Sequence, residues 1–297
     1  MSMGINVLSL FDGMSCGQIA LNRCGVKYDN YFASEIDKHA IKVTQANYPD
    51  TVQLGDVTQV KAADLPKIDL LIGGSPCQGF SFSGKQLNFE DSRSKLFFEF
   101  VRLLKEVKPK YFLLENVAMK KEYEHIITDH LGVEPIKINS ALVSAQTRKR
   151  LYWTNIPNIK EPADKNIAWR DVNGRRDKSV VAAMRGRFCI NGKRQDGKQK
   201  TAGLTQQYIE FRYDSKTNAL TTVSKDNVVV PHTSPKRVLA DDFIFRYLTP
   251  VECERLQTVP DNYTACVSNI QRCKMLGNGW TVDVIAHILK SMLEEQS

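Results

Sequence analysis

One cysteine, Cys77, stands where a thiol could do chemistry rather than pack. It lies in LLIGGSPCQGFSFS (70–83), where an apolar run typical of a buried strand ends in two glycines and a proline. In an open sheet covered by helices, ligands bind at the carboxyl ends of the strands. Cysteine is a good nucleophile even when only a few per cent of it is ionised at neutral pH. The segment therefore predicts a nucleophilic thiol on the loop that follows a strand.

A carboxyl group follows the next strand that the pattern predicts. KYFLLEN (110–116) ends in Glu115 and Asn116, and the ends of neighbouring parallel strands lie at the same edge of a sheet. A thiol beside a carboxylic acid, rather than beside histidine, favours addition to a ring that must accept a proton as the nucleophile attacks. Cysteine-protease chemistry, which pairs the thiol with histidine, is not indicated.

Composition limits the class of protein. The 297 residues, 42% of them hydrophobic, can bury one large core and a smaller lobe. No window reaches 18 apolar residues and no leader pattern opens the chain, so we expect an intracellular protein without a membrane segment. The cysteines are odd in number and show no C-x-x-C spacing, which predicts free thiols and no metal site. They stand at positions 16, 24, 77, 189, 253, 266 and 273.

The elements that must position these groups alternate along the first half of the chain. Short β-type runs and longer helical patterns succeed one another from residue 5 to 155, which predicts an α/β fold with a parallel sheet covered by helices. Helices are predicted at 94–107, after Thr249 in LTPVECERLQ, and at 281–294. The strand candidates are 5–11, 31–34, 52–55, 69–74, 110–116, 136–143 and 151–156.

The segment that follows residue 157 has a different amino-acid composition. Residues 158–240 are rich in Lys, Arg, Asn, Gly, Thr and Gln, with short β-like pieces and a hairpin signal at Asn191 and Gly192. Residues 155–240 hold 17 Lys and Arg against 8 Asp and Glu, a net charge of +9, whereas the whole chain carries +8. We predict a catalytic and cofactor-binding domain (1–157), a small β or irregular lobe (158–240) and C-terminal helices that return to the first domain (241–297). The localised basic excess predicts a polyanion partner, most commonly nucleic acid.

The first strand ends in a turn suited to a nucleotide-like ligand. In FDGMSCGQIAL, Gly13 and Gly17 allow a tight turn into a helix, and Glu35 ends the second strand 22 residues after Gly13, where it could accept both ribose hydroxyls. Asp56 follows the third strand. Because the turn lacks the G-x-G-x-x-G pattern that a dinucleotide pyrophosphate requires, S-adenosylmethionine is a better candidate than NAD.

The chain resembles a known family, the cytosine-5 DNA methyltransferases, over nearly its whole length. The resemblance implies a Rossmann-like methyltransferase sheet with helices on both faces and a small target-recognition lobe. One residue departs from the bacterial pattern: Trp280 stands where many bacterial members have a small aliphatic residue, and with RSKLFFEFVRLL it is more like the eukaryotic de novo branch or some phage enzymes. The matching pieces, in the family's order, are FDGMSCG, the strand ends at Glu35 and Asp56, GGSPCQGFS, SRSKLFFEFVRLL, LLENV, QTRKRLYW, LTPVECERLQTVP and GNGWTVDVIAHI.

The resemblance implies a covalent mechanism. The Cys77 thiolate adds to carbon 6 of cytosine, Glu115 donates a hydrogen bond or proton to nitrogen 3, and Arg148 and Arg150 contact the cytosine and phosphate. The cofactor-binding residues it implies are Phe11, Asp12, Gly13, Met14, Ser15, Gly17, Glu35, Ile36, Asp56, Val57, Pro76, Leu96, Asn278, Gly279 and Trp280. The DNA-binding residues it implies are Gln78, Ser81, Gln146, Arg185 and Arg187.

The expected partner is double-stranded DNA, with no membrane and no metal, and with the protein acting as a monomer. A base within a duplex must be flipped out at a cost of a few kcal/mol, and the loop around Cys77, with Gly79 and Gly84 as hinges, could close over it. We expect a cytoplasmic protein in a bacterial or phage-infected cell, or a nuclear one in a eukaryote.

Three other functions fit parts of the sequence. RNA methylation uses the same chemistry, but the lobe is large and SPCQGFS differs from the cysteine loop of the branch that methylates tRNA. A catalytically silent DNA-binding subunit is disfavoured because Cys77, Glu115 and both arginines are present. An NAD-dependent oxidoreductase is disfavoured by the glycine pattern.

Overall fold

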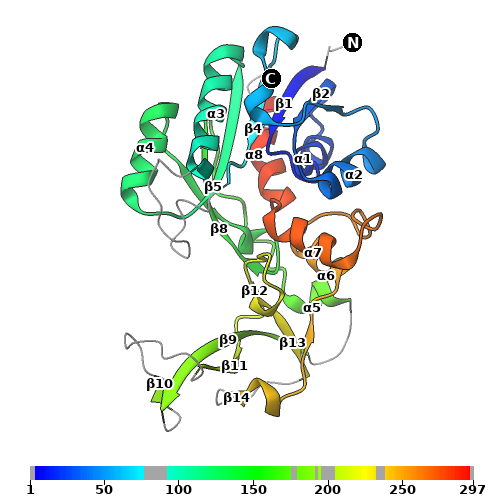
Figure 1. Cartoon of the computed structure of the whole chain (residues 1–297), viewed down its shortest axis with the longest axis vertical. Coiled ribbons are helices and arrows are strands. Elements are labelled where there is room, and N and C mark those ends of the chain that lie inside the picture. Colours follow the sequence, from blue (N-terminus) through cyan, green and yellow to red (C-terminus); the bar gives the residue numbers. More distant parts are fainter. Residues whose placement is uncertain are drawn as a thin grey trace.

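The chain folds around two sheets, a larger one built from its first half and a smaller one built from its second half (Figure 1). The computed structural model describes residues 4–76, 92–174, 179–190, 193–194, 205–231 and 238–294, with the backbone alone for 92–94, 187–190, 193–194 and 205. None of the described helices is long and apolar enough to cross a membrane.

The larger sheet has seven strands in the order β3-β2-β1-β4-β5-β8-β6. The pairs among β3, β2, β1, β4 and β5 are parallel, whereas β8 is antiparallel to both β5 and β6. The strands are β1 (Ile5–Leu10), β2 (Tyr28–Ser34), β3 (Val52–Gln53), β4 (Leu70–Gly73), β5 (Tyr111–Val117), β6 (Ile136–Asn139) and β8 (Lys149–Thr154).

The seven predicted strands are confirmed, and two features of the sheet differ from the prediction. The segment predicted as one strand at 136–143 turns at a 3-10 helix, Ser140–Leu142, after β6 has ended at Asn139. The chain therefore reverses within about ten residues and returns as β8, so this edge of the sheet is antiparallel. A parallel return would have needed a longer crossover connection.

Helices cover both faces of the larger sheet because its strands are apolar on both sides. In β1, Val7 belongs to one apolar cluster, and Leu8 and Leu10 belong to another. The first cluster takes in α1 (Cys16–Cys24) and α8 (Val282–Glu294), through residues such as Ile19 and Ile285. The second takes in α3 (Ser92–Val107) and α4 (Lys121–Leu131). The helices predicted at 94–107 and 281–294 are confirmed by α3 and α8.

The smaller sheet is antiparallel and has a core of its own. Its strands run in the order β14-β11-β9-β13-β15, with β10 paired to β9. They are β9 (Val180–Ile190), β10 (Lys193–Arg194), β11 (Thr205–Phe211), β13 (Val228–Val230), β14 (Val238–Leu239) and β15 (Arg246–Tyr247). Asn191 and Gly192 lie outside the described residues, but Ile190 pairs with Lys193 on either side of them. β15 extends this sheet beyond residue 240, where the lobe was expected to end.

Short elements join the two sheets. β7 (Gln146–Thr147) pairs in parallel with β12 (Thr217–Asn218), and α5 (Trp169–Asn173) buries Trp169 and Val172 in the same cluster as α1 and α8. The start of α6 (Pro250–Leu256) has the predicted capping box of Thr249 and Glu252. The remaining elements are α2 (Lys38–Asn47), α7 (Asn269–Asn278), and 3-10 helices at Val57–Gln59, Ala62–Asp64, Ser224–Asp226 and Ala240–Asp242.

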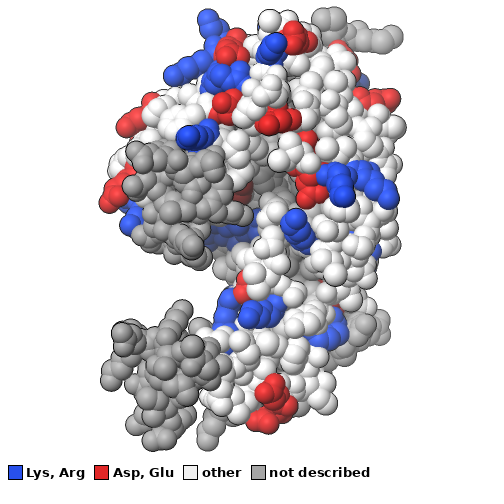
Figure 2. All heavy atoms as spheres, in the orientation of Figure 1, with Lys and Arg blue, Asp and Glu red and all other residues white. Residues whose placement is uncertain are grey.

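Figure 2 shows a hollow between the part of the molecule around the larger sheet and the part around the smaller sheet, with Lys and Arg side chains inside it. The carboxyl ends of β1, β2, β4 and β5 lead toward the middle of the molecule, where α7 also lies (Figure 1). The groups predicted to do chemistry follow these strand ends.

Candidate active site and cofactor pocket

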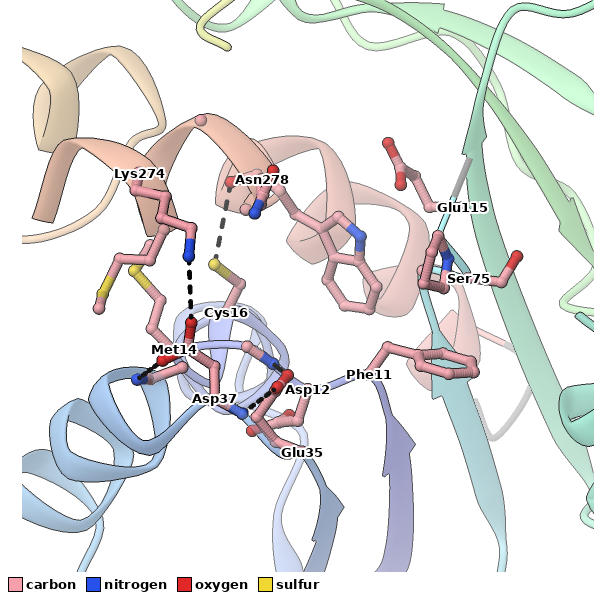
Figure 3. Close-up of a pocket in the computed structure, with 18 of the residues that line it drawn as sticks. Phe11, Asp12, Met14, Cys16, Glu35, Asp37, Ser75, Glu115, Lys274 and Asn278 are labelled. Carbon is pink, nitrogen blue, oxygen red and sulfur yellow. Dashed lines mark hydrogen bonds and ion pairs between the residues drawn. The ribbon is translucent and has the colours of Figure 1, made fainter. Parts of the chain in front are cut away.

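A cavity of about 350 Å³ lies at the carboxyl edge of the larger sheet (Figure 3). Its volume falls within the range of small-molecule pockets. The lining residues come from the ends of β1, β2, β4 and β5, from the start of α1, from α2, from the start of β8 and the residues before it, and from α7 and the turn after it. They are Phe11, Asp12, Gly13, Met14, Cys16, Glu35, Asp37, Ala40, Gly74, Ser75, Pro76, Glu115, Asn116, Val117, Arg148, Arg150, Gln271, Lys274, Met275, Gly277, Asn278, Gly279 and Trp280.

The turn after β1 has an unusual backbone. Phe11, Gly13 and Ser15 all have positive φ values, of 56°, 61° and 62°, and two of them are not glycine. Such conformations cost energy for residues with a side chain and concentrate at ligand-binding sites. The turn is held by main-chain bonds, since the Asp12 amide donates to the Ser34 carbonyl (3.1 Å). The strained turn thus presents Phe11 and Gly13 to the cavity in a fixed position.

Glu35 fixes this turn with its carboxylate. Oε2 accepts from the Gly13 amide (2.8 Å), and Oε1 accepts from the amides of Ile36 and Asp37 (2.8 Å each) (Figure 3). A carboxylate offers roughly four acceptor positions, so three amides leave about one for a ligand. The prediction that Glu35 takes both ribose hydroxyls therefore requires them to share an oxygen or displace an amide.

Asp12 is a second acidic residue of the cavity and is nearly buried. Its carboxylate accepts from the Ser15 hydroxyl (2.5 Å) and from the Tyr31 hydroxyl (2.7 Å). Burial raises the pKa of Asp12 to about 6, although these hydrogen bonds act in the opposite direction. A carboxyl group beside the cavity therefore changes its charge near neutral pH.

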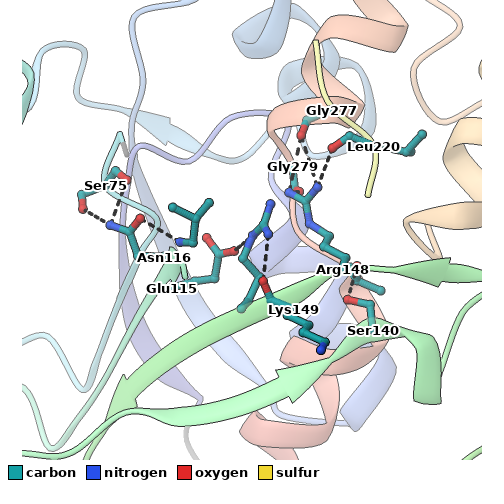
Figure 4. A network of polar contacts seen from close by, with 12 residues as sticks. Ser75, Glu115, Asn116, Ser140, Arg148, Lys149, Leu220, Gly277 and Gly279 are labelled. Carbon is teal, nitrogen blue, oxygen red and sulfur yellow. Dashed lines mark hydrogen bonds and ion pairs between the residues drawn. The ribbon is translucent and has the colours of Figure 1, made fainter. Parts of the chain in front are cut away.

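At the other end of the cavity, Glu115 forms an ion pair with Arg150 (Figure 4). Arg150 Nε lies 2.9 Å from Glu115 Oε1, and both side chains are largely buried, with 15% and 11% of their surface exposed. The antiparallel pairing of β5 and β8 brings the two residues together from strands far apart in the sequence. The next residue, Asn116, donates to the Ser75 hydroxyl (3.2 Å) and so holds the segment that leads to Cys77.

Arg148 has a different environment from Arg150, two residues away. It is 3% exposed, and its guanidinium donates to the carbonyls of Leu220 (2.7 Å), Gly279 (2.9 Å) and Gly277 (3.4 Å). Burial lowers the pKa of Arg148 to about 10, and the charge of Arg150 acts in the same direction. Although Arg148 lines the cavity, most of its donors bind main-chain oxygens. It therefore joins the segment after β12 to the end of α7 and the turn that follows it.

Gln146 was expected to be a DNA-binding residue, and the structure buries it completely. Its amide nitrogen donates to the Leu256 carbonyl (2.6 Å), and its oxygen accepts from the Leu220 amide (3.1 Å). A side chain with no exposed surface and with these partners supports the surrounding loops. These contacts indicate that Gln146 supports the loops around it and does not contact DNA directly.

Several residues predicted for cofactor binding do not line the cavity. Gly17 is in α1, where a Cβ atom would lie 2.5 Å from both the Ile72 Cδ1 atom and the Tyr31 hydroxyl, so it permits close packing of the helix. The Asp56 carboxylate accepts from the Thr58 amide (2.9 Å) and caps a 3-10 helix. The others outside the lining are Ser15 (buried), Ile36 (exposed), Val57 (buried) and Leu96 (half-buried).

The cavity also includes residues that the sequence reasoning missed. Lys274 of α7 lies 3.7 Å from Asp37 across one side of it, and Cys16 donates to the Trp280 carbonyl (3.9 Å) (Figure 3). Burial raises the pKa of Cys16 to about 12, so this thiol stays protonated at neutral pH. Asn116 could have been included, because it directly follows Glu115 at the strand end. For α7 the sequence offered only a weak helical pattern.

Some predicted residues lie outside the described residues or are described only in part. Cys77, Gln78 and Ser81 lie outside the described residues, and Pro76, the last described residue before them, is in the cavity wall. Arg187 is described in its backbone only. Arg185 of β9 forms an ion pair with Asp226. Within the described ranges, no group of three or more His, Cys, Asp or Glu side chains could hold a metal ion.

Comparison with known proteins gives consistent matches. A family model described as C-5 cytosine-specific DNA methylase matches residues 5–294. The type II methyltransferase M1.ScrFI of Lactococcus lactis subsp. cremoris is 32% identical, with 97% of this chain and 78% of that protein covered. The type II methyltransferase M.HhaI of Haemophilus parahaemolyticus is 28% identical, with 96% and 93% covered. The structure of the Entamoeba histolytica methyltransferase EhMeth matches with a TM-score of 0.73 at 18% identity, over 100% of both chains.

Proposed function

Since the chain belongs to the C-5 cytosine-specific DNA methylase family, we propose how its own residues carry out cytosine-5 methylation of DNA. The cavity at the carboxyl edge of the larger sheet takes S-adenosylmethionine at the end formed by the turn after β1. The target cytosine enters at the end formed by Glu115 and Arg150. The observation that carries this assignment is the Glu115–Arg150 ion pair in the same cavity as the strained turn fixed by Glu35.

The residues at the first end suit a ligand with an aromatic base, hydroxyls and a positive charge. Phe11 offers a ring, Glu35 keeps about one free acceptor position, and Asp12 offers a carboxyl group. Asn278, Gly279 and Trp280 close the opposite wall. When bound, S-adenosylmethionine supplies the methyl group for carbon 5 of the base.

The groups that act on the base are Cys77 and Glu115. The Cys77 sulfur forms a bond to carbon 6, which makes carbon 5 nucleophilic. The Glu115 carboxyl group donates a hydrogen bond or a proton to nitrogen 3 of the same ring. Arg150 orients the Glu115 carboxylate and contacts the base or its phosphate. After carbon 5 has been methylated it loses its proton, the sulfur–carbon bond breaks, and the thiolate is released.

Duplex DNA occupies the hollow between the two sheets, where Lys and Arg side chains gather (Figure 2). The lobe of residues 158–240 contacts phosphates and reads the sequence, with Arg185 and Arg187 among its contacts. The loop around Cys77 closes over the flipped cytosine, with Gln78 and Ser81 beside it. We place the protein in the cytoplasm and infer that it acts as a monomer.

The test is methyl transfer from tritium-labelled S-adenosylmethionine to duplex DNA and, separately, to tRNA. We expect label in duplex DNA alone, loss of transfer in Cys77→Ser with retained binding of S-adenosylhomocysteine, and a stable covalent complex with DNA that carries 5-fluorocytosine. Label in tRNA alone would overturn the substrate. Full transfer by Cys77→Ser would overturn the mechanism.

A further inference from the structure

A second cavity, of about 780 Å³, lies behind α7 as seen from the cofactor cavity. It is lined by α6, α7 and the segments 220–224 and 247–250, and it shares Lys274 and Asn278 with the first cavity. α7 is therefore a wall common to both cavities, with α6 beside it (Figure 1). Its volume would admit a molecule of the size of a tripeptide.

Two cysteines line this cavity from adjacent helices. They are Cys253 of α6 and Cys273 of α7, and each thiol is the leading influence on the pKa of the other, as expected of neighbouring groups. Both are free cysteines, Cys253 buried and Cys273 half-buried. Among the described residues, this is the pair of thiols placed to react with each other.

The two helices hold these thiols in register through the neighbouring residues. Arg272 forms a buried ion pair with Glu254 (2.9 Å), one residue away from each cysteine. Further along, the Gln257 amide donates to the Leu276 carbonyl (2.7 Å). These bonds fix α6 against α7 next to both cysteines and about one turn further along, so the two helices hold their relative positions.

The two thiols differ in a way that suits thiol–disulfide exchange. Cys273 is half-buried beside the cavity, whereas Cys253 is buried, so Cys273 is the thiol that a disulfide from solution can reach. The neighbouring Cys253 thiol lowers the pKa of the Cys273 thiol to about 7, and the Arg272 charge acts in the same direction. The neighbouring Cys273 thiol, together with burial, raises the pKa of Cys253. Cys273 is therefore the nucleophile and Cys253 the resolving thiol.

We propose that Cys253 and Cys273 form a modification site, where exchange with a low-molecular-weight disulfide such as glutathione disulfide links α6 to α7 beside the cofactor cavity. The Cys273 thiolate attacks one sulfur of the glutathione disulfide, forms a mixed disulfide and releases one glutathione. The Cys253 thiol then loses its proton, and its sulfur attacks the Cys273 sulfur and releases the second glutathione. The two cysteines are oxidised and the glutathione disulfide is reduced to two thiols.

Formation of the Cys253–Cys273 disulfide alters the cofactor cavity because α7 lines both cavities. The bond draws Cys273 toward α6, and the same helix carries Lys274 and Asn278 on the cofactor side. We expect the affinity for S-adenosylhomocysteine to fall about fivefold or more, the lower range of coupling between two sites. This second readout rests on the proposed function, whereas formation of the disulfide does not.

The experiment equilibrates the full chain in glutathione buffers of rising disulfide fraction, stops exchange with acid, alkylates free thiols and maps the peptides by mass spectrometry. We expect a Cys253–Cys273 linked peptide that dithiothreitol removes. Cys273→Ser should give no linked peptide, and Cys253→Ser should stop at a mixed disulfide on Cys273. Cys266→Ser, which removes another half-buried thiol, is the matched control and should still give the link.

Binding of S-adenosylhomocysteine by calorimetry, before and after oxidation, gives the second readout, because oxidation of Cys77 would itself abolish methyl transfer. Absence of the linked peptide at every ratio, or a mixed disulfide on Cys273 alone in the unaltered chain, would overturn the proposed site. A linked peptide with unchanged affinity would overturn the effect on the cofactor cavity. A reduced protein that binds no S-adenosylhomocysteine would instead contradict the proposed function.

Discussion

The parts of the molecule around the larger and the smaller sheet are stabilised differently. The larger sheet has apolar side chains on both faces, and helices cover each face with a separate buried cluster. The smaller sheet has one cluster of its own with six buried members: Ala182, Met184, Ile209, Val228, Val230 and Ala240. The groups proposed for chemistry lie in the first part, and Arg185 and Arg187, which are proposed to contact DNA, lie in the second. The catalytic groups thus lie on a sheet with a large apolar core on each face, whereas the lobe proposed to recognise DNA has one small core.

The largest expected effect concerns a group fixed by the larger sheet. Glu115→Gln should lower methyl transfer by about 10² to 10⁴, the usual contribution of a positioned acid or base, because an amide cannot donate a proton to the base. Binding of S-adenosylhomocysteine should stay unchanged. Methyl incorporation and calorimetry measure the two. Glu124→Gln, which alters a buried carboxylate on α4, is the control; a parallel loss of cofactor affinity in Glu115→Gln would contradict its role.

The two cores can be compared by one substitution made in each. Ile127 of α4 and Ile209 of β11 are both fully buried, and changing an isoleucine to alanine in a core costs about 2–5 kcal/mol. Ile127→Ala should lower the melting temperature of the larger-sheet part and weaken cofactor binding. Ile209→Ala should speed amide exchange in β9 and β11 and leave cofactor affinity unchanged.

Equal loss of cofactor affinity in the two isoleucine variants would show that the two parts unfold together. That result would contradict the expectation that the core of the larger-sheet part and the core of the smaller-sheet part are independently stable. Hydrogen exchange read by mass spectrometry, with calorimetry on the same samples, distinguishes the two outcomes.

A pH titration tests how tightly the cofactor end is packed. The folded-state pKa of Asp12 is raised from 3.8 to about 6, so its contribution to stability is fully present below pH 4 and is lost as the pH rises through about 6. The shift corresponds to at most about 3 kcal/mol. Asp12→Asn should abolish this decline, as measured by urea unfolding between pH 4 and 8. Parallel stability curves for the two proteins would mean that Asp12 is not desolvated.

The smallest effect is expected from the recognition side. If Arg185 contacts a phosphate, Arg185→Gln should reduce the slope of log affinity against log salt by about 0.9. The measurement is fluorescence anisotropy with labelled duplex DNA at several salt concentrations. Lys67→Gln, which removes an exposed charge at the opposite edge of the larger sheet, should leave the slope unchanged. An unchanged slope in Arg185→Gln would assign this arginine to its ion pair with Asp226 alone.

Much of the larger sheet could be predicted because its strands are short apolar runs that end in functional residues. The same pattern located Glu115 and Glu35 at strand ends. The antiparallel edge could not be predicted, since the residues after β6 show no clear break where the chain turns. The smaller sheet was expected only in outline, because polar segments separate its strands and its order depends on distant pairings such as that of β9 with β13.

The two arginines of QTRKR show why some site residues could not be placed from sequence. Both are charged and both were expected to contact the substrate, but only the fold decides which one meets carbonyls and which one meets Glu115. The sequence equally gave no sign that Asp12 would be buried against Tyr31, because their contact depends on the packing of β2 beside β1. Apart from Asn278, the residues of α7 were missed, because half of them are polar and they show only a weak helical pattern.

The buried carboxyl group of Asp12 has a consequence for calorimetry. Near pH 6 about half of the molecules carry a proton there, and a cationic ligand that docks next to it favours the ionised form. Docking would then expel a fraction of a proton into the buffer. The heat measured for the same ligand should therefore differ between phosphate and imidazole buffers by that fraction of the difference in their ionisation enthalpies, and the difference should vanish at pH 8.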